Sequence, residues 1–248
     1  MKTFGLIGRH LQHSFSPAYF AEKFAKEGIE NCAYELFPLE EIGELEALLK
    51  EKNHWGGLNV TIPYKTDVIP FLDELSPQAK AIGAVNTIQF LEGKRIGHNT
   101  DVYGFQVALE EQLTTAQRNS RALVLGTGGA SKAVVYALKN LNIPYQYVSR
   151  TATKDYWTYS DLTAERLREH LILINTTPLG MSPNSNTCPD LDYEALSDAH
   201  LLFDLVYNPE ETLFMQRGRA VGAAAINGLK MLHLQAEKAW AIWNKIGE

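Results

Sequence analysis

Short apolar runs alternate along the chain with segments whose apolar residues recur at helical spacing, which predicts strands alternating with helices. One helix is expected to begin at Ser16-Pro17 and to end at Gly28, and the last helix to cover 229–246. Strands are expected at residues 2–7, 34–37, 58–60, 87–91, 95–98, 122–125, 145–148, 171–175, 201–205 and 223–226. Repeated βαβ units of this kind form parallel sheets with right-handed crossovers.

The order of these elements predicts an α/β fold of two domains, with the boundary near residue 100. The N-terminal part is expected to be an α/β domain that holds a substrate, and residues 101–228 a doubly wound Rossmann-type domain. Because the sequence has no Pro/Ser-rich linker, the two domains are expected to adjoin at a cleft.

A glycine-rich turn, LVLGTGGAS at residues 123–131, joins a predicted strand to a predicted helix. This context is typical of the dinucleotide fingerprint, with Gly126 for the tight turn and Gly128 for close approach of the pyrophosphate. The free N–H groups at the start of the helix stabilise the negative charge of the pyrophosphate. Ser131 stands where the fingerprint has glycine or alanine. The alternative interpretation is a glycine turn that only closes a βα unit.

The end of the next strand indicates which nucleotide is bound. A free ribose 2′-hydroxyl favours an acidic partner there, whereas a 2′-phosphate favours arginine. The strand ends at Ser149-Arg150-Thr151, with Lys154 close behind and Asp155 late in the loop. We therefore predict NADP rather than NAD, the alternative being that Arg150 is a solvated loop charge.

Composition narrows the choice of partners. The 248 residues carry a formal net charge of −6 with scattered basic residues, so nucleic acid and anionic membranes are poor candidates. Cys32 and Cys188 are too few for a disulfide framework, and no histidine has a companion at zinc spacing, so no metal is expected. Neither a signal peptide nor a membrane span is visible, which predicts a cytoplasmic protein.

Polar segments lie at the ends of predicted strands, where side chains can converge on a crevice. Taken singly, Ser16 and Asp101 are more simply helix caps, and Asn86 a turn residue. Taken together, these segments make the chain resemble shikimate dehydrogenase over essentially its whole length. The matching motifs are HSFSP at 13–17, NVTIPYK at 59–65, GAVNT at 83–87, NTD at 99–101, the glycine turn, DLVYNP at 204–209, and GLKML at 228–232 with Gln235.

The resemblance implies reversible reduction of the 3-keto group of 3-dehydroshikimate by NADPH, giving shikimate on the way to chorismate and the aromatic amino acids. It implies that Ser14, Ser16 and the Tyr207 hydroxyl bind the substrate carboxylate. Further ligands of the carboxylate surroundings and ring hydroxyls are implied at Asn59, Thr61, Asn86 and Gln235. For Gln235 to reach the substrate, the C-terminal segment 229–248 must return to the first domain, residues 1–100.

Lys65 and Asp101 are, by the same resemblance, the catalytic pair. Hydride delivery to a ketone builds negative charge on its oxygen, so a cation or proton donor placed there lowers the barrier. Lys65 fits that role. An adjacent Asp101 carboxylate would hold the ammonium in place, favour its charged form and bind a substrate hydroxyl.

The resemblance also implies which residues contact the cofactor. They are Gly126, Thr127, Gly128, Gly129, Ala130, Ser149, Arg150, Thr151, Lys154, Thr176, Pro178, Met181, Leu205, Gly228 and Met231. Core packing is the alternative role for Met231. Two positions depart from the family pattern: Ser149 stands where asparagine is common, and residues 8–11 lack a usual proline.

Two other functions stay open at this point. A quinate/shikimate dehydrogenase of the same fold, using NAD or NADP, would need a site that tolerates the C1 hydroxyl of quinate. A non-catalytic nucleotide-binding protein would have the fold alone, and the presence of Lys65 and Asp101 argues against it. Both a monomer and a homodimer are compatible with the sequence.

Overall fold

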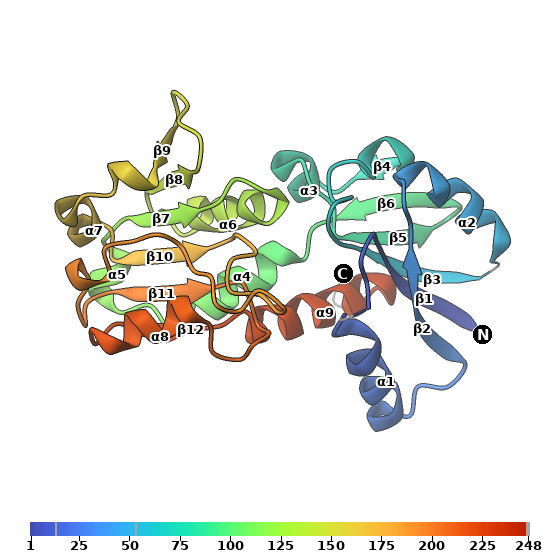
Figure 1. The fold of residues 1–248 in the computed structure, drawn as a ribbon. Helices are drawn as coiled ribbons and strands as arrows, with labels where there is room; N and C mark the ends of the chain where they lie inside the picture. The colour runs from blue at the N-terminus through green and yellow to red at the C-terminus, as the bar shows by residue number, and fades with distance from the viewer. Residues whose placement is uncertain (13, 53, 247–248) are drawn as a thin grey trace. The chain divides into compact units, whose positions relative to one another are not determined.

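The computed structural model describes residues 1–12, 14–52 and 54–246, which form two compact units. The first unit contains Met1–Thr100 together with the residues from Ala236 on, and the second contains Asp101–Gln235. Each unit is built around one six-stranded sheet (Figure 1). None of the helices in the described parts of the chain is long and apolar enough to cross a membrane.

The sheet of the first unit is mixed. Its strands are β1 (Lys2–Gly8), β2 (Cys32–Pro38), β3 (Trp55–Val60), β4 (Glu74–Leu75), β5 (Thr87–Leu91) and β6 (Lys94–His98), in spatial order β2-β1-β3-β5-β6-β4. β1 pairs in parallel with β2 and β3, whereas β5 runs antiparallel to β3 and β6. The carboxyl ends of β1 and β3 and the amino end of β5 therefore meet at one edge of the sheet.

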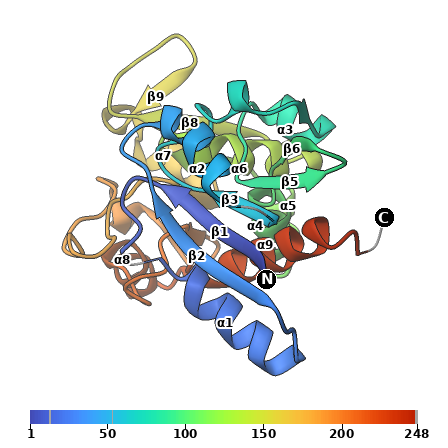
Figure 2. The ribbon, with the colours of Figure 1, turned by 90° about the vertical axis from the view of Figure 1, so that its right-hand side faces the viewer.

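Helices cover both faces of this sheet. They are α1 (Ser16–Glu27), α2 (Leu45–Glu51) and α3 (Pro77–Ile82), with 3-10 turns η1 (Ile42–Glu44) and η2 (Ile69–Phe71). Phe20 and Phe24 of α1 pack with Phe4 on one face, whereas Leu45 of α2 packs with Ile7 on the other. Figure 2 shows α1 and α2 on these opposite faces.

Local sequence accounts for most of these boundaries. Glu92 and Gly93 both adopt positive φ, 51° and 79°, so a two-residue turn closes the predicted hairpin and β6 begins at Lys94. The expected start of α1 is corrected in one respect. Phe15 occupies the N-cap, Ser16 is already the first helical residue, and the helix start has no side-chain cap.

α9 (Leu229–Trp243) begins in the second unit and ends in the first. In the first unit the Trp243 indole N–H donates to Ile88 O at 3.0 Å, and its ring lies 5.0 Å from that of Phe4. Gly57 makes room for the indole, because a Cβ at this position would lie 2.2 Å from it. The expected return of the C-terminal helix to the first unit is confirmed, and the first unit takes up the chain again at Ala236.

The sheet of the second unit is parallel throughout. Its strands are β7 (Ala122–Leu125), β8 (Tyr145–Ser149), β9 (Tyr156–Thr158), β10 (Ile172–Asn175), β11 (Leu201–Asp204) and β12 (Ala224–Ile226), in the order β12-β11-β10-β7-β8-β9. This is the doubly wound order, and it confirms the predicted fold class. The strand order reverses between β7 and β10, the switch point at which such sheets bind ligands.

The remaining elements of the second unit connect these strands. They are α4 (Asp101–Glu110), α5 (Thr115–Arg118), α6 (Gly129–Asn140), η3 (Tyr159–Asp161), α7 (Ala164–Glu169), η4 (Tyr193–Ala195) and α8 (Leu213–Ala220). β7, β10 and β11 are buried along their whole length, as expected for central parallel strands covered on both faces. β4 and β9 were not predicted from the sequence, because both are very short.

Candidate active site

The first unit gathers predicted residues at the shared strand edge defined by β1, β3 and β5. Asn59 lies in β3 opposite Leu6 of β1 and opposite Thr87, the first residue of β5. Asn86 comes immediately before that strand, and Thr61 follows β3, with its N–H donating to Ile7 O at 2.9 Å. The register therefore brings Asn59, Thr61 and Asn86 together.

Asn86 organises the segment that leads to Asp101. Its side chain is 2% exposed, and its Oδ1 accepts the N–H of Thr100 at 2.7 Å and the Thr87 hydroxyl at 3.1 Å. Its Nδ2 donates to Thr100 Oγ1 at 3.0 Å. Nearby, Asn99 Nδ2 donates to Ala84 O at 3.0 Å. Thr100, the residue before Asp101, is thus held by the buried amide of Asn86 rather than by a turn alone.

Asn59 is engaged on both sides of its amide. Its Nδ2 donates to Asn86 O and to Thr87 Oγ1, each at 3.2 Å. Its Oδ1 accepts the hydroxyl of Tyr34 at 2.8 Å. Tyr34 lies in β2 and belongs to none of the motifs noted in the sequence. No sequence pattern therefore predicted its contact with Asn59.

Lys65 lies in a turn after β3 and is half-buried. Its carbonyl accepts the N–H of Val85 at 2.7 Å, which ties the lysine backbone to the segment before Asn86. At the start of α1, Ser14 Oγ accepts the N–H of Ser16 at 3.4 Å. His13, the first residue of that motif, lies outside the described residues.

The second unit brings Asp101 and Gln235 onto facing helices. Asp101 is the first residue of α4 and is 3% exposed. Gly104 lies one turn further along α4 and touches α9, since a Cβ there would lie 2.4 Å from Met231 O and 3.2 Å from the backbone N of Gln235. Glycine at this position is what lets the two helices approach. Tyr207 is half-buried in the loop after β11.

The glycine turn lies at the switch point. Gly126 has φ +106°, and a Cβ there would lie 2.8 Å from Thr176 Oγ1, so the turn packs directly against the residue that follows β10. At the start of α6, a Cβ on Gly128 would meet nothing, the helix has no side-chain cap, and its first turn carries no acid. This exposed helix start fits a pyrophosphate. The predicted neighbours in the turn are Thr127, Gly129 and Ala130.

Ser131, the departure from the fingerprint, is accommodated inside the turn. Its side chain is fully buried, and its hydroxyl donates to Gly128 O at 2.7 Å. A serine here therefore braces the turn instead of loosening it.

The expected adenosine contacts lie on an exposed loop. Only residues 150–155 connect β8 to its parallel neighbour β9, although such crossovers usually need about a dozen residues or more. Arg150, Thr151 and Lys154 are exposed on this loop, and the N–H of Thr151 donates to Ser149 Oγ at 3.3 Å. At its base, Gln146 Nε2 donates to Asp155 O at 3.0 Å.

The remaining cofactor candidates come after the carboxyl ends of β10, β11 and β12, on loops or, for Met231, on α9. Pro178 O accepts the N–H of Met181 at 3.1 Å, and the Met181 side chain is 46% exposed. Gly228 abuts Leu205, because a Cβ there would lie 2.2 Å from Leu205 O. Met231 is buried on α9 at 7% exposure, consistent with the alternative of core packing.

Asp204 had no predicted role beyond membership of a motif. It ends β11, is fully buried, and accepts the Asn175 amide at 2.9 Å, the Val206 N–H at 3.0 Å and the Thr212 hydroxyl at 2.6 Å. Burial raises the pKa of its carboxyl to about 6, and these hydrogen bonds offset part of the rise. Asp204 thereby joins β10, the Tyr207 loop and the start of α8.

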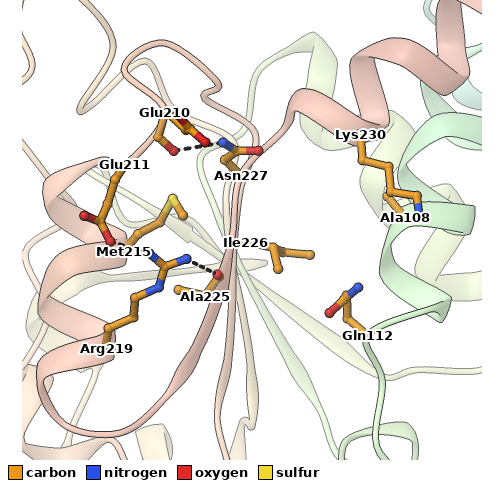
Figure 3. A pocket seen from close by; sticks show the side chains of 10 residues that line it. All are labelled: Ala108, Gln112, Glu210, Glu211, Met215, Arg219, Ala225, Ile226, Asn227 and Lys230. Carbon is orange, nitrogen blue, oxygen red and sulfur yellow. Dashed lines mark hydrogen bonds and ion pairs between the residues drawn. The ribbon is translucent and has the colours of Figure 1, made fainter.

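A hollow of about 540 Å³ lies elsewhere on the second unit, between α4, α8 and the segment after β12 (Figure 3). None of the predicted site residues lines it. Its two cations are already paired: Arg219 binds Glu211 and donates to Ala225 O at 2.8 Å, and Lys230 binds Glu111. In the described parts of the chain, no cluster of His, Cys, Asp or Glu could hold a metal ion.

The doubly wound sheet and its open glycine turn define a Rossmann-type dinucleotide-binding protein with a second α/β unit. The family model described as "Shikimate dehydrogenase substrate binding domain" matches residues 6–88. A shikimate dehydrogenase (NADP(+)) of Clostridium beijerinckii is 41% identical over 260 residues, covering 99% of this chain and 93% of the relative. The chain belongs to the shikimate dehydrogenase family.

Solved structures agree with this membership. A shikimate 5-dehydrogenase of Thermus thermophilus, in complex with NADP(H) and shikimate, matches with a TM-score of 0.87 at 33% identity, covering 99% of this chain and 94% of that one. A quinate dehydrogenase of Corynebacterium glutamicum, in complex with NAD, matches with a TM-score of 0.81 at 28% identity, covering 98% and 94%.

Proposed function

We propose that this chain catalyses the NADPH-dependent, reversible reduction of 3-dehydroshikimate to shikimate, within chorismate and aromatic amino-acid biosynthesis. The observation that carries the proposal is the 41% identity to a shikimate dehydrogenase (NADP(+)) over 99% of the chain. The gathering of the expected substrate residues at one strand edge of the first unit supports it. In this assignment the first unit binds substrate and the second binds NADP.

The bound nicotinamide cofactor supplies the hydride, and the side chains of the chain deal with the charge that develops on the substrate. Lys65 stabilises or protonates the C3 oxygen, which lowers the barrier by electrostatic and general-acid effects. Asp101 orients the lysine ammonium and binds a ring hydroxyl. Asp101 is the first residue of α4 and directly follows Thr100, whose backbone N–H donates to Asn86 Oδ1.

The substrate carboxylate is assigned to the hydroxyl groups of Ser14, Ser16 and Tyr207. Thr61, Asn86 and Gln235 are assigned to the carboxylate surroundings and ring hydroxyls. Asn59 is assigned to the same groups: its amide N–H groups are engaged by Asn86 and Thr87, and its oxygen, which accepts the Tyr34 hydroxyl, has a second lone pair for a substrate hydroxyl.

The preference for NADP over NAD is assigned to the β8–β9 loop. Arg150 and Lys154 place two cations on a six-residue loop at the carboxyl end of β8, where a 2′-phosphate is bound in this fold. The pyrophosphate is assigned to the start of α6, where Gly128 leaves the backbone open.

Steady-state rates with shikimate and with quinate, each with NADP and with NAD, test the reaction. The highest kcat/KM is expected for shikimate with NADP. Equal or higher kcat/KM for quinate would identify the chain as a quinate/shikimate dehydrogenase instead; its Corynebacterium glutamicum neighbour is a quinate dehydrogenase. Nucleotide binding with no oxidation of either substrate would favour the non-catalytic alternative.

A Lys65→Met variant tests the catalytic assignment. We expect kcat to fall by about a hundredfold or more, the range of general acid-base catalysis, with little change in the KM for NADP. Near-normal turnover would remove Lys65 from the chemistry. A raised shikimate KM at normal turnover would make it a binding residue.

The site of action and the assembly state complete the proposal. We place the reaction in the cytoplasm, with the chain as a monomer or homodimer and small molecules as its ligands. The two cysteines are both unpaired in the structure, which is compatible with a reducing compartment. Cell fractionation and light scattering of the purified chain test these two statements.

A further inference from the structure

We propose that the Thr177 hydroxyl is a positioning group for the nicotinamide half of NADP, acting through the loop 176–181 that follows β10. The inference rests on the proposed function, in which the chain binds NADP and residues of this loop contact it. No role was predicted for Thr177 from the sequence. Its role follows from the hydrogen bonds that join its hydroxyl group to Asn175 and Leu179.

The loop 176–181 lies where the nicotinamide half is expected. In this fold the cofactor crosses the switch point, with one half on each side of it. The adenosine half is assigned to the end of β8, so the nicotinamide half falls on the β10 side. Thr176 Oγ1 donates to the carbonyl of Leu125, the last residue of β7, at 2.7 Å, and a Cβ on Gly126 would lie 2.9 Å from Thr177 Cγ2. The loop therefore begins in contact with the glycine turn.

The direction of each hydrogen bond around Thr177 is fixed by chemistry. Leu179 O is a backbone carbonyl and can only accept, so the atom of Asn175 that lies 3.2 Å from it is the amide nitrogen. The other polar atom of Asn175 is then its carbonyl oxygen, which accepts the Thr177 hydroxyl at 2.6 Å. With its proton committed to Asn175, the Thr177 oxygen accepts the backbone N–H of Leu179 at 3.2 Å.

Asn175 holds Thr177 from a fixed position. It is the last residue of β10 and is fully buried, and its second amide proton is donated to Asp204 Oδ1 at 2.9 Å. Its Oδ1 also accepts the backbone N–H of Thr177 at 3.0 Å. Both protons and both lone pairs of this amide are therefore used within the second unit. The end of β10 thus fixes Thr177 and, through the Thr177 hydroxyl, the backbone at Leu179.

Thr177→Val removes the hydroxyl and keeps the methyl group that lies against Gly126. The N–H of Leu179 then loses its acceptor, and one of the ties between the loop and the end of β10 is gone. The loop gains conformational freedom, and binding of the nicotinamide half must order it again.

Calorimetric binding of NADP and of adenosine 2′,5′-bisphosphate to the Thr177→Val variant tests the inference. The second ligand carries the adenosine and the 2′-phosphate and lacks the nicotinamide half. We expect the Kd for NADP to rise about fivefold, the equivalent of about one neutral hydrogen bond. The Kd for adenosine 2′,5′-bisphosphate should stay within about twofold, because this ligand binds on the β8 side of the switch point. A general loss of structure in the second unit would weaken both ligands.

Two further variants separate the hydroxyl from the other effects of the substitution. Thr177→Ser keeps the hydroxyl and loses the methyl group, so its NADP Kd should stay within about twofold of that of the wild type. Thr163→Val is the matched control, because the Thr163 hydroxyl also accepts one backbone N–H, that of Arg166, at 3.3 Å. Thr163 caps α7, which leads into the amino end of β10, so this variant should leave both Kd values within about twofold. Thermal melting of all variants records any loss of folding.

Three results would overturn the inference alone, given a wild-type chain that binds NADP. They are an unchanged NADP Kd in Thr177→Val, an equal weakening of both ligands in that variant, and a Thr177→Ser variant weakened as much as Thr177→Val. A wild-type chain that binds NADP but does not oxidise shikimate would instead overturn the proposed reaction, and the Kd values would still decide the inference. A wild-type chain that binds no NADP would overturn the proposed cofactor and the inference with it.

Discussion

The buried carboxylate of Asp204 should give the second unit a pH-dependent stability that one substitution removes. Burial raises the pKa of this carboxyl from 3.8 to about 6. The native state therefore binds the Asp204 proton more tightly than the unfolded chain does. The resulting stabilisation is fully present below pH 3.8 and is lost as the pH rises through about 6.

The magnitude follows from the two pKa values. A pKa difference of about 2 corresponds to about 3 kcal/mol when the whole titration is included. Between pH 4.5 and pH 7.5, linkage predicts that about 2 kcal/mol of this stabilisation is lost. The side chain is fully buried, so solvent does not screen the effect.

Asp204→Asn keeps the shape and removes the titration. The amide oxygen can still accept from Asn175 and Val206, and the new NH₂ can donate to the Thr212 hydroxyl, which turns to accept. The variant should therefore fold, and its unfolding free energy should lack the Asp204 contribution at every pH.

Guanidinium unfolding at pH 4.5, 6 and 7.5, followed by circular dichroism, measures the difference between wild type and variant. Taking the difference cancels the titration of the other carboxylates, which both proteins share. We expect wild type to lose about 2 kcal/mol relative to Asp204→Asn between the two extreme pH values. A difference that is independent of pH, or that changes with the opposite sign, would refute the reasoning.

Three further predictions concern the turn, the returning helix and the nucleotide loop. Gly126→Ala should raise the NADP KM about tenfold or more, because φ is +106° and the new methyl would lie 2.8 Å from Thr176 Oγ1; an unchanged KM would contradict this. Trp243→Phe should lower the unfolding free energy by about 1–2 kcal/mol in denaturant titrations, because Ile88 O loses its donor; equal stability would argue against this bond. Gln146→Met should raise the KM for NADP severalfold more than that for NAD, because Asp155 O at the loop base loses its donor; equal changes would separate the loop from 2′-phosphate recognition.

The sequence predicted the second unit best, because its signals are local. The buried strand before Gly126, the glycine turn and the amphipathic helix after it are adjacent in the chain, and each is found where expected. β9 escaped prediction for a physical reason. Parallel neighbours are normally separated by a helix, and here only residues 150–155 intervene.

The sequence predicted less of the first unit's polar network, because its partners are distant in the chain. Ser16 looked like a helix cap, whereas the structure places it inside the first turn of α1, with Phe15 at the cap position. Tyr34 gave no signal at all. Its polar partner Asn59 lies on β3, and only the pairing of β2, β1 and β3 brings the two together.

The polar residues at the strand edge of the first unit form one network, so the loss of one side chain affects more than its own contacts. Asn59 donates to Asn86 O and to Thr87 Oγ1 and accepts the Tyr34 hydroxyl, so replacing it removes three hydrogen bonds at once. Its carbonyl oxygen has two lone pairs, and the second can still accept from a substrate hydroxyl. Motif matching sees only the possible contact with substrate, whereas the network appears once β2, β1, β3 and β5 are paired.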